Sequence, residues 1–140
     1  MALKDLMVHL DPGERTGTRL ELAVGLARAH DARLVGVFGM RALAEQVGVV
    51  ATWPSPEYVA SATASKAAFE TATSGLREAE WRDVNRGSDS ELIRLITEEA
   101  RYTDLVVVGQ HDETADVMVA PELAEELIIH SGRPILVVEE

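Results

Sequence analysis

The run from Asp104 to Asp112, Asp-Leu-Val-Val-Val-Gly-Gln-His-Asp, constrains the fold more than any other part of the chain. Four apolar residues, three of them β-branched, lead directly into a glycine, which predicts a strand buried on both faces of a parallel sheet. Gly109 permits a sharp turn where that strand ends, and open α/β sheets bind ligands at the carboxyl ends of their strands. A small-molecule site is therefore expected beside Gly109.

Strand and helix patterns alternate along the whole chain. Strands are predicted over residues 3–10, 33–38, 80–85, 105–108 and 134–138. Helices are predicted from residue 16 or 18 to about 30, and over 56–79, 89–101 and 121–130, with a short helix around 42–47. This alternation predicts a single α/β domain over residues 1–140, with a doubly wound, five-stranded parallel sheet and helices on both faces.

Local signals support these helices and indicate which residues face the core. Asp11-Pro12-Gly13 predicts a turn, Ser55 precedes a proline that begins a helix, and Ser88 with Glu91 has the spacing of a capping box. The third strand lacks an alternating pattern, so it is expected at an exposed edge. The predicted inward-facing residues are Leu20, Leu22, Val24, Leu26, Ala27, Val59, Ala62, Phe69, Ala72, Leu76, Leu92, Ile93, Ile96, Ala100, Leu123, Leu127 and Ile128.

Composition and charge exclude several classes of function. The formal net charge is −11, with Lys4 and Lys66 as the two lysines, so phosphates of nucleic acid and anionic membrane surfaces would repel the chain. No stretch approaches eighteen apolar residues, and no signal peptide is recognised at the start. The absence of cysteine removes thiolate chemistry and agrees with a cytoplasmic location.

Three features in order resemble the universal stress protein family. Leu10-Asp11 ends the first strand before a glycine-containing turn, and Gly87 ends the third before a helix and Asp104-Leu-Val-Val-Val-Gly109. The chain then closes with Ser131-Gly-Arg-Pro-Ile-Leu-Val-Val138. The resemblance covers essentially the whole chain. It implies a sheet of order 3-2-1-4-5 and a dimer.

One branch of that family binds ATP through a Gly-x2-Gly-x9-Gly-Ser/Thr loop after the fourth strand. Here Gly109 matches the first glycine, but Asp112 stands at the second, and Pro121-Glu122 stand at the final Gly-Ser. The acids would repel phosphate by several kcal/mol per contact at ~4 Å, and Pro121 removes a backbone donor. No lysine or arginine lies between Gly109 and Arg133 to compensate. ATP binding in the usual mode, or any other cofactor, is therefore not predicted.

The candidate ligand pocket consists of residues at the ends of the first, third and fourth strands: Asp11, Gly87, Gly109, Gln110 and His111. Two interpretations of Asp11 stay open, a nucleoside contact as in the family or a turn residue that caps the next helix. His9 is predicted as a buried, hydrogen-bonded core residue. The loop around His111 matches no known metal spacing, so it is interpreted as solvated, and no metal site is predicted. No nucleophile–base pair is apparent, and no catalytic residue is predicted.

The last strand is predicted to lie at a sheet edge. Ile135, Leu136, Val137 and Val138 would there expose apolar side chains and unpaired backbone. Antiparallel pairing of this edge with its copy would form a two-fold homodimer.

The sequence thus predicts a non-catalytic, homodimeric universal stress protein that acts in a stress response through interaction or an unidentified small ligand. The first alternative is an ATP- or AMP-binding member with a modified phosphate loop. The second is a small hydrolase of the related nucleotide-binding superfamily.

Overall fold

The computed structural model describes residues 3–41, 54–111 and 119–139. These form five parallel strands in the order β3-β2-β1-β4-β5 and four helices, as predicted. The strands are β1 (Asp5–Leu10), β2 (Arg33–Phe38), β3 (Ala79–Asp83), β4 (Leu105–Gly109) and β5 (Ile135–Val138). The helices are α1 (Thr16–His30), α2 (Pro56–Ala72), α3 (Asp89–Ala100) and α4 (Leu123–His130).

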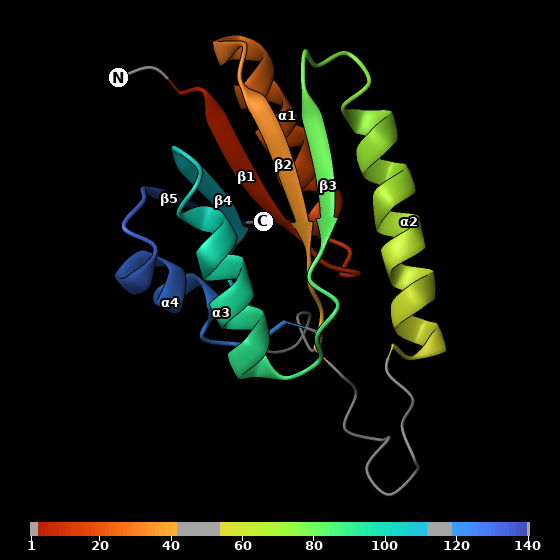
Figure 1. Ribbon diagram of the computed structural model, residues 1–140. Coiled ribbons are helices and arrows are strands. Elements are labelled where there is room, and N and C mark those ends of the chain that lie inside the picture. Colours follow the sequence, from red (N-terminus) through yellow and green to blue (C-terminus); the bar gives the residue numbers. More distant parts are fainter. Residues whose placement is uncertain (1–2, 42–53, 112–118, 140) are drawn as a thin grey trace, which may run out of the picture.

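Alternation along the strands divides the core between the two faces of the sheet. In β1, Leu6, Val8 and Leu10 pack with α1 and α2, whereas Met7 packs with α3 and α4. Figure 1 shows the same arrangement, with α1 and α2 on one face and α3 and α4 on the other. All strands run in one direction, so their carboxyl ends form one edge of the sheet.

Specific contacts fix the first strands. Asp104 accepts hydrogen bonds from the backbone N–H groups of Lys4 (2.9 Å) and Asp5 (3.0 Å), which ties the start of β1 to β4. On the other side of β1, Gly36 lies directly beneath the ring of Phe69, because an added Cβ would stand 2.6 Å from Phe69 Cε1. This glycine therefore sets how closely α2 approaches the sheet.

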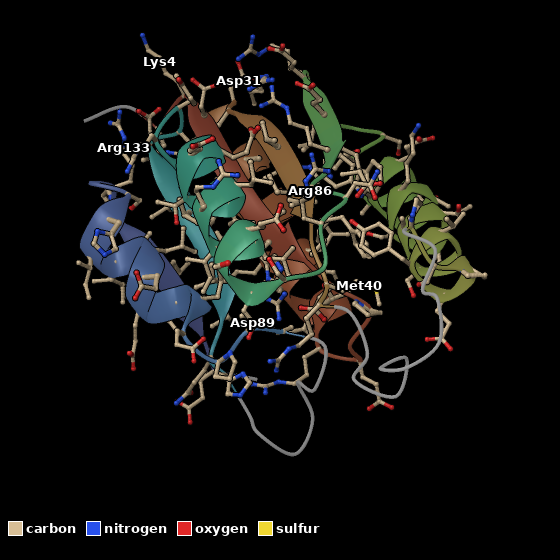
Figure 2. All side chains as sticks on the ribbon, turned by 60° about the horizontal axis from the view of Figure 1, so that its bottom comes forward. Lys4, Asp31, Met40, Arg86, Asp89 and Arg133 are labelled. Atoms are coloured by element: carbon tan, nitrogen blue, oxygen red, sulfur yellow. The ribbon has the colours of Figure 1, made fainter. Side chains whose placement is uncertain are left out.

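Figure 2 labels residues at both ends of the sheet. Lys4, Asp31 and Arg133 lie at the end where the strands begin, and Met40 and Asp89 lie at the opposite end. At that second end, Arg41 pairs with Asp89 at 2.7 Å. The chain after β2 is thus tied to the first turn of α3.

The helix starts were predicted better than the helix ends. Ser55 accepts from Tyr58 N and Ser88 from Glu91 N, so both serine caps are confirmed. The Glu91 carboxylate accepts from the Ser88 hydroxyl, so the reciprocal half of the capping box is not formed. The prediction that the second helix reaches residue 79 is wrong, because α2 ends at Ala72. Strand β3 accordingly begins at Ala79 and is mostly exposed, as expected for an edge.

Three residues predicted to face inward are exposed: Leu22, Val59 and Ile128. Each helix buries a narrower stripe than its apolar pattern suggests. Helix α4, for example, buries Leu123 and Leu127, one turn apart, and turns Ile128 outward. The short helix predicted around 42–47 lies outside the described residues. Within the described part of the chain, no helix is long and apolar enough to cross a membrane.

Candidate functional site

Asp11 shapes the turn that follows β1. Its Oδ1 accepts a hydrogen bond from Gly13 N at 2.7 Å, and its own N–H donates to Thr16 Oγ1 at 3.2 Å. It does not cap α1, whose first residue follows Arg15 without a side-chain cap. Asp11 is therefore a turn residue, as one of the two interpretations predicted. The part of that interpretation in which Asp11 caps the next helix is wrong.

Arg19 of α1 is the partner of this carboxylate. Only 3% of Arg19 is exposed, and its Nη1 donates to the backbone oxygen of His9 at 2.8 Å and to Asp11 Oδ2 at 3.0 Å. Asp11 is equally buried. A buried carboxylate needs such a partner, because both the desolvation of a charge and an unpaired acceptor are costly. Sequence analysis overlooked Arg19.

His9 completes the cluster beneath the turn. Its Nε2 lies 3.2 Å from the oxygen of Gly39, and its Nδ1 lies 3.9 Å from Asp11 Oδ2. The ring is buried and hydrogen-bonded, as predicted for a core histidine.

The cluster sets the charge state of Asp11. Burial alone would raise the pKa of this carboxyl. Electrostatic interactions with His9 and Arg19, with hydrogen bonds from Arg19 and Gly13 N, oppose it and hold the pKa below its ordinary value of 3.8. Asp11 is therefore ionised at neutral pH.

Gly109, at the end of β4, lies against the same guanidinium. A Cβ added at Gly109 would stand 2.9 Å from Arg19 Cζ and 3.0 Å from Nε. A glycine at this position allows close approach to the backbone. Here the guanidinium of Arg19, rather than a ligand, approaches the backbone of Gly109.

Arg19 leaves little space beside Gly109. The cavity among these residues has a volume of about 20 Å³, enough for about one water molecule, whereas small-molecule pockets are typically about 300–1,000 Å³. Its lining residues are His9, Asp11, Arg19, Val108, Gly109, His111, Val119, Ala120, Pro121, Leu123 and Ala124. The space beside Gly109 is therefore filled by protein atoms. On the other side of Asp11, an open groove of about 400 Å³ lies between the turn after β1 and α2.

The predicted pocket residues divide into two groups. Asp11, Gly109 and His111 line one cavity, and so does Pro121 of the phosphate-loop prediction. Gln110 is exposed and gives its N–H to the oxygen of Val138, and Gly87 does not line this cavity.

The remaining residues of the phosphate-loop prediction do not line this cavity. Glu122 is exposed and immediately precedes α4. Asp112 lies outside the described residues. Over residues 3–41, 54–111 and 119–139, no cluster of three or more His, Asp or Glu side chains is placed to hold a metal ion.

Strand β5 carries exposed apolar side chains at the far edge of the sheet. Within the described residues it pairs with β4 alone. Of the seven large hydrophobic residues that are exposed among the described residues, two lie in β5, Leu136 and Val137, and two lie in the preceding helix α4, Ile128 and Ile129. Ile135 and Val138 are half-buried.

Solved structures of universal stress proteins share this architecture. UspA from Lactobacillus plantarum has a TM-score of 0.64 at 16% identity, covering 99% of this chain and 99% of that one. A family protein from Burkholderia pseudomallei has a TM-score of 0.62 at 20% identity, covering 98% and 96%. The Archaeoglobus fulgidus protein in complex with dAMP has a TM-score of 0.62 at 15% identity, covering 98% of each chain.

The chain has the universal stress protein fold. No family model matches its sequence, and no curated protein sequence matches it either. The likeness to universal stress proteins therefore lies in the sheet order and the placement of the helices.

Proposed function

We propose that this chain is a non-catalytic universal stress protein that does not bind adenine nucleotides at the carboxyl edge of its sheet. It acts in a stress response, in the cytoplasm, through contacts with other proteins or with an unidentified small ligand. The observation that carries the proposal is the buried Asp11–Arg19 pair, which fills the edge beside Gly109 and leaves a cavity of about 20 Å³.

Energetics support the exclusion of a nucleotide. A nucleotide at this edge would displace Arg19 and leave the carboxylate of Asp11 buried without its cation. Removal of one partner of a buried ion pair typically costs about 3–5 kcal/mol. The acidic residues Asp112 and Glu122, at the positions where the ATP-binding branch has its second Gly and its final Ser/Thr, add repulsion of phosphate.

Thermal unfolding with millimolar ATP, ADP or AMP, with and without magnesium, tests this proposal. We expect no change in melting temperature, because a ligand stabilises a protein only to the extent that it binds the folded state. The Archaeoglobus fulgidus protein with dAMP is the positive control. A rise of several degrees with any adenine nucleotide would overturn the proposal, and turnover of ATP in the same tube would favour the hydrolase alternative.

One observation favours nucleotide binding as a second candidate. The Archaeoglobus fulgidus protein, with the same fold, is in complex with dAMP. A modified loop could bind nucleotide here only if Arg19 left Asp11. Crosslinking with 8-azido-ATP, followed by mapping of the labelled peptide, distinguishes the two: label on β1, α1 or β4 would support this candidate.

We further propose that β5 forms a two-fold dimer by antiparallel pairing with its copy. The support is the apolar edge of Leu136 and Val137, together with the exposed Ile128 and Ile129 of the preceding helix α4. Light scattering should give a dimer for the natural chain and a monomer for Val137→Lys. Val59→Lys, the same substitution at an exposed valine of α2, should remain dimeric. A natural chain that is monomeric would exclude this dimer.

A further inference from the structure

A groove of about 410 Å³ lies between α3 and α4, on the face of the sheet opposite to α1 and α2. Its volume lies within the range of small-molecule pockets, about 300–1,000 Å³. Helix α3 contributes one continuous face, and α4 contributes Glu126 and His130. The α3 side consists of Ser90, Ile93, Arg94, Thr97, Glu98 and the following residue Arg101, at the 3–4 residue spacing of a single helical stripe. From end to end this stripe is about 16 Å long.

Thr97 is a buried polar residue in this groove. Only 5% of its surface is exposed, and its Oγ1 has no hydrogen-bond partner among the described residues. Most buried hydroxyls are paired, and threonines within helices commonly donate to the carbonyl four residues earlier. The oxygen is covered in the rotamer shown, so it can donate to an acceptor in the groove after a rotation about χ1 of Thr97.

Charges along the groove are unequally compensated. Arg94 pairs with Glu98 at 3.4 Å, and His130 pairs with Glu126 at 3.1 Å. Arg101 has no carboxylate within 4 Å in the part of the chain that the structure describes, and its Nη2 donates instead to the backbone oxygen of His130 at 3.3 Å. This bond places the guanidinium across one end of the groove, where α3 meets α4.

The two donors are neighbours on the helix. Thr97 and Arg101 are four residues apart, so they lie about 5–6 Å apart at Cβ on the same face. A carboxylate can accept from both, one oxygen from the hydroxyl and one from the guanidinium. One turn further along, Ile93 offers an apolar surface for the rest of such a molecule.

We propose that the α3–α4 groove binds a small amphipathic carboxylic acid, with its carboxylate on Thr97 and Arg101 and its hydrocarbon chain on Ile93. This site shares no residue with the closed edge around Asp11 and Arg19. It gives the protein a small-molecule ligand that does not depend on nucleotide chemistry.

Titration of the ¹⁵N-labelled full chain with octanoate, followed by amide chemical shifts, tests the site. We expect saturable shifts along residues 93–101 and 126–130, with a dissociation constant below about 1 mM, and no shifts at Asp11 or Gly109. The neutral analogue 1-octanol should not produce the saturable shifts at Arg101. Absence of saturation, or shifts that map to β5 or to the carboxyl edge, would overturn the proposal.

Three variants separate a specific carboxylate site from adsorption of a fatty chain. Arg101→Gln should weaken octanoate binding about tenfold or more, since it removes a charged hydrogen bond. Thr97→Val should weaken binding about threefold without lowering the melting temperature, because the hydroxyl has no partner to lose in the free protein. The control Arg77→Gln, at an exposed arginine paired with Asp31, should bind as the natural chain does. Equal affinity in all three variants would contradict the assignment.

Discussion

The two ends of the sheet use charged side chains in opposite ways. At the carboxyl end, the carboxylate of Asp11 and the guanidinium of Arg19 are both buried. Arg19 also donates a hydrogen bond to the backbone oxygen of His9, near the end of β1. At the amino end, Arg33 faces three carboxylates, Asp5, Glu78 and Glu80, that are all substantially exposed. Water screens the second group and is excluded from the first, so a count of ion pairs says little about which end depends on them.

Asp11→Leu should have the largest effect on stability. It leaves Arg19 buried without its carboxylate, which should lower the free energy of unfolding by about 3–5 kcal/mol, measured by urea denaturation. Arg19→Met should cost a similar amount, because it leaves the carboxylate of Asp11 buried without the guanidinium.

The double variant Asp11→Leu/Arg19→Met separates the pair from its parts. Because both charges are removed together, its stability should approach that of the natural chain. If the double variant loses the sum of the two single losses, the two side chains do not act as a pair.

Gly109→Ala should have the next largest effect. The methyl group of the new alanine would overlap the guanidinium of Arg19, which two hydrogen bonds hold in place. Overlap of this kind typically lowers the free energy of unfolding by about 1–3 kcal/mol. In the Arg19→Met background the loss should shrink, because the obstructing group is gone. Additive losses in the two backgrounds would show that Arg19 does not occupy the space beside Gly109.

Acid should weaken the carboxyl end in a predictable direction. The folded-state pKa of Asp11 lies below 3.8, so its contribution to stability is present above that pH and is lost as pH falls through the folded pKa. Asp104 and Glu80 have lowered pKa values as well and change stability in the same direction.

Urea denaturation at several pH values separates Asp11 from the other carboxylates. The free energy of unfolding of the natural chain should fall from about pH 5 to about pH 2. The double variant Asp11→Leu/Arg19→Met should fall less over the same range. Parallel curves for the two proteins would mean that Asp11 does not contribute to the acid sensitivity.

Arg33→Ala should have the smallest effect. Exposed ion pairs contribute about 0–1 kcal/mol, and salt weakens them further, so the loss should disappear in high salt. A loss as large as that of Asp11→Leu would remove the distinction between the two ends.

The sheet order could be predicted because each strand is an apolar run bounded by turn residues. Arg33–Phe38 was predicted to the residue, and Asp11-Pro12-Gly13 and Gly109 marked the strand ends. The end of α2 was missed because Thr73 and Ser74 continue the Ala-, Ser- and Thr-rich composition past Ala72, and no proline follows before β3. The signal was Gly75, three residues later.

Arg19 could not be found from the apolar pattern, since that pattern selects only apolar residues such as the neighbouring Leu20. Its spacing was informative in hindsight: Arg19 is one helical turn before Ala23, on the buried stripe of α1. The groove between α3 and α4 was not predictable either. It depends on how closely two helices from distant parts of the sequence approach each other, which no local pattern specifies.

The Asp11–Arg19 contact also has a kinetic consequence, because its partners are eight residues apart. A loop this short closes at little entropic cost, so β1, the turn and α1 can form their polar contact early, before β4 joins the sheet. Gly109 would then dock late, against a guanidinium that is already in place. Stopped-flow measurements should accordingly show that Asp11→Leu mainly slows folding, whereas Gly109→Ala mainly speeds unfolding. The reverse assignment of rates would mean that β4 forms first and the arginine arrives last.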